Sequence, residues 1–126
     1  MGRKNERGAK EKVSKYNNKK TQVDMYVFDS ILEAKRYKEL KILERNGEIK
    51  NLELQPHFLL QENFKKNGKA YRKIEYIADF KYEENGQVIV EDVKGKETEV
   101  FKLKRKMFEY NYPNLSLKII TKEDVR

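Results

Sequence analysis

Apolar residues recur at helical spacing in two segments of the chain. The apolar arc of the first segment consists of Leu32, Tyr37, Leu40 and Leu43. Ser30, followed three residues later by Glu33, is a capping-box signature, and Gly47 suits the position just after a helix C-cap. We therefore expect a helix from about Ser30 to Asn46.

The second helix is expected over Glu97–Asn111, because Pro113 ends the pattern. Its apolar face is predicted to consist of Val100, Leu103, Met107 and Phe108. The basic residues of this region lie away from that face, namely Lys102, Arg105 and Lys106, with Lys96 just upstream. Such a face is either simply solvated or able to neutralise phosphate groups.

Stretches rich in Ile, Val, Tyr and Phe predict strands between the helices and after the second one. In chain order they are a short strand in VDMYVF, a strand bent near Pro56 in IKNLELQPHFLLQENF, two hairpin strands at about Tyr71–Tyr82 and Gln87–Val93, and a last strand in LSLKIIT. Phe64–Lys69 is expected to be a turn around Asn67-Gly68. The order α-β-β-β-α-β predicts an α/β fold with one mixed sheet and helices packed on it.

Asn85-Gly86 is a strong hairpin signal, since a two-residue type I′ turn needs positive φ at both positions. A loop of these two residues pairs Phe80 with Glu91 and Asp79 with Asp92. Two carboxylates directly opposite each other destabilise a sheet. A purely structural hairpin therefore has little reason to carry this pair.

A bound divalent cation removes the conflict, because Mg²⁺ takes oxygen ligands from one or two carboxylates together with phosphate and water. Period-two alternation also puts Lys94 on the same face as Asp92. Its ammonium group could stabilise the negative charge that develops on a phosphate. The alternative is that Asp79 and Asp92 face solvent on a half-exposed hairpin, with Lys94 pairing one of them.

Glu33 falls within the apolar arc of the first helix, so its side chain is expected to point toward the sheet. As a capping-box residue it could instead accept a hydrogen bond from the backbone N–H of Ser30. Together with Asp79 and Asp92, it would be a third acid near a metal ion.

Composition adds a basic segment at the start of the chain. The protein has 126 residues, a net charge of +8 and no cysteine, which indicates one domain without disulfides or thiolate metal sites. Residues 1–20 hold eight Lys or Arg against two Glu and few apolar residues. We expect a flexible basic arm there and a single folded domain over residues 21–126. Such an arm, including Lys19 and Lys20, suits DNA backbone binding or serves only solubility.

No apolar run is long enough to cross a bilayer, and no signal peptide is recognisable. We therefore expect a cytoplasmic protein without a membrane partner.

The acidic residues and their order resemble those of the PD-(D/E)XK nuclease superfamily. That pattern has an acid on the first helix, an Asp on the second core strand and Asp-x-Lys on the third, which here are Glu33, Asp79 and Asp92-Val93-Lys94. Ala78 stands where the family name has Pro. The segments KYNNKKT, FDSILEAKRY, LELQP, YIADF and VEDVKG also resemble a small family of phage-encoded domains. Among characterised proteins, the likeness is to phage junction-resolving endonucleases and to endonuclease subunits of some transposition systems.

This resemblance implies a restriction-endonuclease-like αβββαβ core that hydrolyses phosphodiester bonds in DNA. Asp79 and Asp92 would hold one or two Mg²⁺ ions, for which Mn²⁺ could substitute, with the Val93 carbonyl and Glu33 as further ligands. Lys94 would position the attacking water and help deprotonate it, or stabilise the pentavalent phosphate.

The resemblance also suggests substrate and assembly. Gln55 occupies a first-strand position where relatives often place a polar active-site residue, although its neighbour Pro56 offers a plain turn explanation. The expected substrate is branched or junction DNA in phage recombination or processing, because the small domain has no extra module for reading base sequence. A homodimer follows from the two-fold symmetry of junctions, and no nucleotide cofactor is expected.

Other functions stay open. A ββα-metal nuclease needs a histidine base, and the chain has only His57, next to a proline. A non-catalytic DNA-binding or phage assembly factor on the same frame would be expected to have lost Asp79, Asp92 or Lys94. A transposition subunit would cut only with its partner protein, and a nonspecific or nicking endonuclease is the alternative within nucleases.

Overall fold

The computed structural model describes residues 19–125, so the predicted basic arm lies outside the described residues except for its last two positions. The elements are β1 (Thr21–Val23), β2 (Tyr26–Phe28), α1 (Ile31–Arg45), β3 (Lys50–Leu54), β4 (His57–Gln61), β5 (Phe64–Lys66), β6 (Lys69–Tyr71), β7 (Ile74–Ile77), β8 (Phe80–Glu84), β9 (Gln87–Val93), α2 (Glu99–Asn111) and β10 (Ser116–Ile120). Among these residues, no helix is long and apolar enough to span a membrane.

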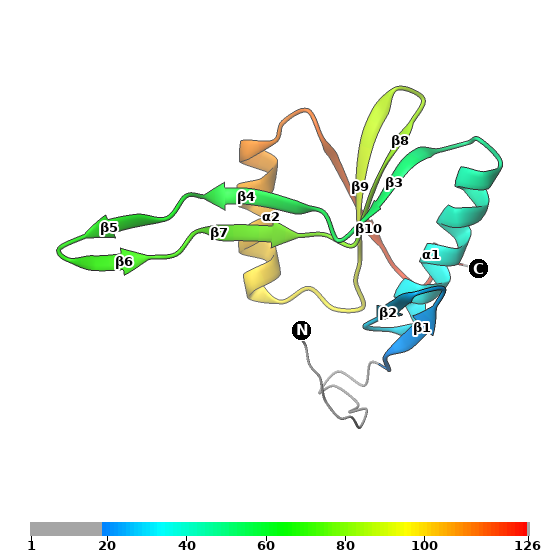
Figure 1. Ribbon diagram of the computed structural model, residues 1–126, viewed down its shortest axis with the longest axis horizontal. Coiled ribbons are helices and arrows are strands. Elements are labelled where there is room, and N and C mark those ends of the chain that lie inside the picture. Colours follow the sequence, from blue (N-terminus) through cyan, green and yellow to red (C-terminus); the bar gives the residue numbers. More distant parts are fainter. Residues whose placement is uncertain (1–18, 126) are drawn as a thin grey trace.

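The centre of the molecule is a four-stranded sheet with the order β10-β9-β8-β3. β10 runs parallel to β9, whereas β8 is antiparallel to both β9 and β3, so the sheet is mixed. The helices α1 and α2 lie on opposite sides of it (Figure 1). The predicted α/β class, with a mixed central sheet flanked by helices, is confirmed.

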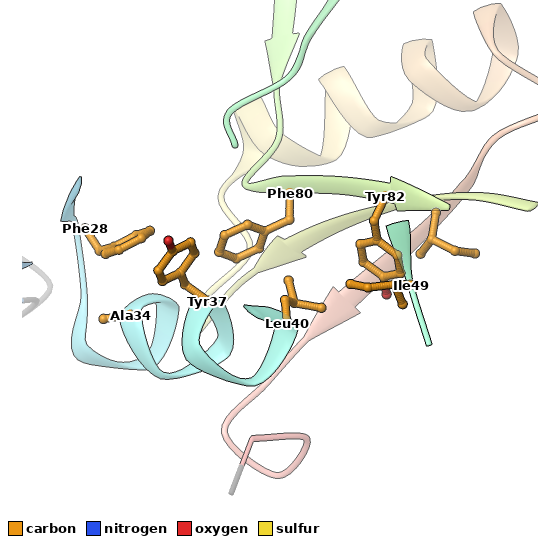
Figure 2. Packing of buried hydrophobic residues seen from close by; sticks show 8 residues of the cluster. Phe28, Ala34, Tyr37, Leu40, Ile49, Phe80 and Tyr82 are labelled. Atoms are coloured by element: carbon orange, nitrogen blue, oxygen red, sulfur yellow. The ribbon is translucent and has the colours of Figure 1, made fainter. Parts of the chain in front are cut away.

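Each face of the sheet carries its own apolar core. Between α1 and the sheet lie Phe28, Tyr37, Leu40, Phe80 and Tyr82 (Figure 2). Under α2 lie Phe58, Tyr76, Val90, Phe101 and Phe108. Because successive residues of a strand point to opposite faces, neighbouring residues of β9 belong to different cores: Ile89 to the first and Val90 to the second.

Both helices begin at capping residues. The Ser30 hydroxyl accepts a hydrogen bond from the Glu33 N–H at 3.0 Å, and α1 ends before Gly47, whose φ is +80°. The predicted helix at Ser30–Asn46 is therefore confirmed. α2 begins slightly later than predicted, because the Thr98 hydroxyl accepts from the Phe101 N–H at 3.1 Å and caps it.

The predicted apolar face of α2 is wrong for two of its four residues. Val100 and Leu103 are 63% and 59% exposed, whereas Phe101 and Phe108 are buried. The two phenylalanines lie seven residues apart on one side of the helix, and both rings contact Tyr76. Two aromatic rings remove more apolar area from water than the smaller side chains do, so their stripe sets the rotation of α2.

The single strand predicted over Tyr71–Tyr82 is also wrong, since it is divided into β6, β7 and β8. β8 stays in the central sheet, whereas β7 leaves it and pairs with β4. The chain bends at Ala78-Asp79, between β7 and β8. The neighbouring segment bends beside it at Gln55-Pro56, between β3 and β4, as the sequence predicted near Pro56.

Backbone hydrogen bonds hold these two bends together. The Ala78 N–H donates to the Pro56 carbonyl at 3.1 Å, and the Gln55 N–H donates to the Asp79 carbonyl at 2.9 Å. Gln55 has a φ of +50°, an uncommon value for a residue with a side chain. Both strands thus leave the sheet at the same level and continue as a two-stranded ribbon.

The ribbon consists of residues 57–77. Its base, β4 and β7, packs against α2, and its tip, β5 and β6, projects away from the body of the molecule (Figure 1). β4 pairs with β7 at its base, and β5 pairs with β6 at its tip. The tip turns at Asn67 and Gly68, which have φ values of +52° and +76°. The predicted Asn-Gly turn is confirmed, but short strands flank it where a longer turn was expected.

The predicted hairpin register is confirmed from Glu84↔Gln87 to Phe80↔Glu91. It does not continue to an Asp79–Asp92 pair within the ladder. At the bend, the Asp79 N–H donates to the Glu91 carbonyl at 3.0 Å. The two aspartates therefore approach each other through their side chains at the end of the ladder.

A buried ion pair joins α1 to the centre of the sheet. Glu91 of β9 is fully buried, and its carboxylate accepts hydrogen bonds from Arg36 Nε at 2.8 Å and from Arg36 Nη2 at 2.5 Å. The Tyr82 hydroxyl donates to the same carboxylate at 2.5 Å. These hydrogen bonds raise the pKa of Arg36 above its usual range.

Removing one partner of this pair should destabilise the protein strongly, because the other charge stays buried. We expect Arg36→Ala to lower the free energy of unfolding by about 3–5 kcal/mol, measured by urea denaturation. The triple variant Arg36→Met/Glu91→Leu/Tyr82→Phe removes all three polar groups and should recover most of that loss. A single variant as stable as the parent would contradict a structural role for this pair.

Candidate functional site

A pocket of about 600 Å³ lies where β9 ends and α1 begins. All four predicted catalytic residues line it: Glu33, Asp79, Asp92 and Lys94. They come from α1, from the bend before β8, and from the end of β9 and the residue after it. The pocket is also lined by Gln55, Val93 and Lys96, which were predicted as metal or DNA contacts.

Asp79 is fixed in this pocket by the bend that ends the ribbon. Its Oδ2 accepts a hydrogen bond from the Val93 N–H at 2.7 Å. Its carboxyl group also shares hydrogen bonds with the side chains of Glu33 and Asp92. The structure thus places the Val93 amide on Asp79, whereas the predicted role of the Val93 carbonyl stays a prediction.

Asp92 is held on both sides by its neighbours. It is only 3% exposed, so the solvent-facing alternative is wrong for this residue. The Tyr76 hydroxyl donates to its Oδ2, and the Nζ of Lys94 lies 3.6 Å from its Oδ1. Lys94 is in turn held over the ring of Phe101, 4.4 Å from the ring centroid.

Glu33 completes the acidic group from the first turn of α1. It is 7% exposed, and its backbone N–H is the one that Ser30 caps. Its carboxyl group shares a hydrogen bond with Asp79. The cap therefore uses the backbone of Glu33 and leaves its side chain directed at the pocket.

Burial and repulsion between neighbouring carboxylates raise the pKa values of Glu33 and Asp79. Burial, followed by the charges of Asp29 and Asp92, raises the pKa of Glu33 to about 7. Burial, followed by the charges of Glu33 and Asp92, raises the pKa of Asp79 to about 9. A bound cation would offset this repulsion and favour the ionised forms of Glu33 and Asp79.

The donor set suits a hard divalent cation. Within residues 19–125, no group of three or more His, Asp or Glu side chains is arranged so that it could hold a metal ion. Mg²⁺ does not require such a group, since it is usually bound by one or two carboxylates and keeps several waters. Asp79 and Asp92, which both line the pocket, fit that requirement.

The other predicted DNA contacts are more scattered. Lys20 forms an ion pair with Asp29 at 3.0 Å, beside the pocket, and Lys19 is exposed. On α2, Lys102 pairs with Glu99 at 3.4 Å. Arg105 lies 4.0 Å from Glu97. The structure brings Gln55 and Lys96 to the pocket but not these helix residues, which are absent from its lining.

Sequence reasoning missed two residues that position the site. Tyr76 gives no sequence signal beyond its strand composition, yet its hydroxyl donates to Asp92, and burial with the nearby Asp92 charge raises its pKa. Phe101 was not assigned to any face, yet it supports Lys94. Tyr76 lies three residues before Asp79 in the chain. Only the bend between β7 and β8 brings its side chain to Asp92 of β9.

The raised pKa values predict that the metal-free protein loses stability as the pH rises. Glu33 and Asp79 bind protons more tightly when folded, so their contribution is full below their ordinary pKa values of 4.5 and 3.8. It is lost as the pH rises through about 7 and about 9. Between pH 5 and pH 9, unfolding in EDTA should become easier by at least about 1.4 kcal/mol, which corresponds to one pKa unit.

Asp79→Asn should flatten this pH dependence in thermal or urea unfolding, because it removes one of the titrating groups. Glu109→Gln, on the exposed side of α2, is the matched control and should leave the pH dependence unchanged. Parent and Asp79→Asn curves of equal slope would refute the buried acidic group.

Comparison with known proteins supplies a family but no activity. No curated protein and no solved structure is significantly similar to this chain. Residues 13–124 match a family described as "Protein of unknown function (DUF1064)". The match covers nearly the whole chain, so the protein belongs to the DUF1064 family.

Proposed function

We propose that this protein is a metal-dependent DNA endonuclease with a restriction-endonuclease-like core. The observation that carries the proposal is the pocket in which Glu33, Asp79, Asp92 and Lys94 meet. These residues come from separate parts of the chain, and sequence reasoning had grouped them before their positions were known. Placing three acids in one partly buried pocket costs stability, which is typical of a functional site.

The arrangement of elements supports the same proposal. The acid of α1 and the acids of the β8–β9 hairpin meet at one end of a mixed sheet that lies between two helices. This agrees with the αβββαβ order that the resemblance to PD-(D/E)XK nucleases implies. The additional ribbon and the short β1–β2 hairpin are departures from that order.

Asp79 and Asp92 would hold the metal ion, with Glu33 as a direct or water-mediated ligand. A bound divalent cation in such a site polarises the phosphate and lowers the pKa of water. Tyr76 and the Val93 amide keep the two aspartates oriented. A preorganised ligand set of this kind does not need to rearrange when it binds.

Lys94 is placed to act on the phosphate. Its ammonium group lies next to Asp92 and over the Phe101 ring, at the wall of the pocket. From there it can stabilise negative charge that develops on the phosphate oxygens, or position the attacking water. Phe101 acts as a positioning residue for this group.

Branched DNA is the substrate we propose, in phage recombination or processing. The described residues form a small body and a ribbon, with no separate module for reading base sequence. Symmetric cleavage of two strands at a junction requires two copies of the site, so the active form would be a homodimer.

Metal binding can be tested apart from cleavage. We expect Mg²⁺ or Mn²⁺ at millimolar concentration to raise the melting temperature of the parent, because the cation relieves repulsion among the acids and binds only the folded state. Asp79→Asn and Asp92→Asn should each lose most of this shift, and the Glu109→Gln control should keep it. An equal shift in all four proteins would show that the cation binds elsewhere.

Cleavage should depend on the metal and on the pocket residues. We expect the parent to cut a four-way junction faster than a flap or a linear duplex in Mg²⁺ or Mn²⁺, and to cut nothing in EDTA. Lys94→Ala should reduce the rate by about 10²–10³-fold, the usual cost of losing one group that stabilises transition-state charge. Asp92→Asn should bind the junction and fail to cut it.

The controls separate the possible results. Lys106→Ala changes an exposed lysine of α2 and should cut like the parent. If Asp92→Asn and Lys94→Ala both cut normally, the site assignment is wrong. If the parent binds junctions but cuts no substrate with any metal, the protein is a DNA-binding or partner-dependent subunit instead.

A further inference from the structure

The tip of the ribbon is strongly basic. Residues 64–73 include five positive side chains, Lys65, Lys66, Lys69, Arg72 and Lys73, and no Asp or Glu. Every one of these ten residues is exposed. Lys73, at the end of this segment, forms an ion pair with Glu75 of β7 at 3.3 Å. The rest of the segment extends beyond α2 and away from the central sheet (Figure 1).

One face of the tip combines aromatic rings with lysines. The register pairs Phe64 with Tyr71 and Lys66 with Lys69, so these four side chains share a face. The two rings stack with their centroids 4.8 Å apart, and the Nζ of Lys69 lies 5.1 Å from the centroid of Tyr71. The stacked rings stiffen the tip of the ribbon, which consists of two strands and has no core of its own.

The lysine pair at the turn costs the ribbon stability. Lys66 and Lys69 are direct cross-strand partners, and like charges in that position repel each other. An acidic partner would remove this repulsion. A polyanion with regularly spaced charges suits the ribbon better than a single acidic side chain, because positive charges occur along both of its strands.

The base of the ribbon is part of the candidate site. Gln55 lies two residues before the start of β4, Ile77 ends β7, and both line the pocket. At roughly 3.3 Å per residue, the six to nine residues from Ile77 to the tip span roughly 20–30 Å. That distance corresponds to about six to nine base pairs of duplex DNA at 3.4 Å per base pair.

We infer that the ribbon is a second DNA-binding element, which holds the phosphate backbone of a duplex arm about six to nine base pairs from the cleaved bond. A two-stranded ribbon is narrow enough to enter the major groove, where flexible lysines reach the phosphates on either side. Lysines act as point charges, so the contact would be independent of base sequence. The inference rests on the proposed function for its substrate class and adds a contact outside the pocket.

The test is DNA binding in EDTA, where the parent cannot cut. A fluorescein-labelled duplex of about 30 base pairs and a four-way junction are titrated with parent and with Lys65→Gln/Lys66→Gln/Lys69→Gln, and anisotropy is followed. We expect the variant to bind at least about tenfold more weakly at physiological salt. The slope of log K against log salt should fall by about 2–3, since each lost phosphate contact contributes about 0.9.

The matched control is Lys38→Gln/Lys118→Gln/Lys122→Gln, which removes the same charge from exposed positions on α1, within β10 and just after β10. It should bind within about twofold of the parent. Phe64→Ala/Tyr71→Ala tests the stacked rings, and should weaken binding without changing the salt slope. Unchanged melting temperatures would show that the body of each variant is folded.

The outcome is separable from that of the cleavage assay. If ribbon-dependent binding is seen but nothing is cut, the ribbon inference stands and the catalytic proposal fails. If the parent cuts DNA while the ribbon variant matches it in affinity and salt slope, the ribbon inference is overturned and the catalytic proposal stands. The inference would also be overturned if the ribbon lysines were needed for binding to a protein or RNA ligand but not for binding to DNA.

Discussion

The structure depends on a paired bend at which two neighbouring strands leave the central sheet together. Backbone hydrogen bonds between Gln55 and Asp79 and between Ala78 and Pro56 keep the two strands in contact where they bend. Because Pro56 has no N–H and Gln55 takes a positive φ, the regular ladder cannot continue through this point. The bend ends the sheet, brings the Asp79 side chain to the pocket and directs the ribbon away from the body.

The strand beside the bend shows how position decides the state of a buried acid. Glu91 and Asp92 are adjacent in β9 and both buried, but they face opposite sides of the sheet. Glu91 meets the Arg36 guanidinium and the Tyr82 hydroxyl, which satisfy its charge and make it a structural residue. Asp92 lies close to other acidic side chains, and the single positive charge of Lys94 neutralises this group only in part. We therefore assign the first acid a structural role, and we propose that the second helps to hold a cation.

Much of the architecture was predictable because its signals are local. Ser30 and Gly47 mark the ends of α1 through backbone geometry that depends on neighbouring residues alone. Asn85-Gly86 sets the register of β8 and β9 in the same way. The register places Phe80 opposite Glu91, so the next residues, Asp79 and Asp92, come close together at the end of the ladder.

The rotation of α2, the division of the long strand and the path of the ribbon were decided only by tertiary structure. Val100 and Leu103 are as apolar as the residues of the core, so composition does not show that they are exposed. Packing against Tyr76 puts Phe101 and Phe108 on the buried side of α2 instead. The stretch from Tyr71 to Tyr82 has strand composition throughout, so nothing local marks the point at which it changes partner from β4 to β3 and β9. Local preferences in the sequence indicated both helices, most of the strands and the tight turns, because those preferences act over a few residues. Which strands pair, and which buried acid finds a counter-charge, depends on contacts between residues far apart in the chain.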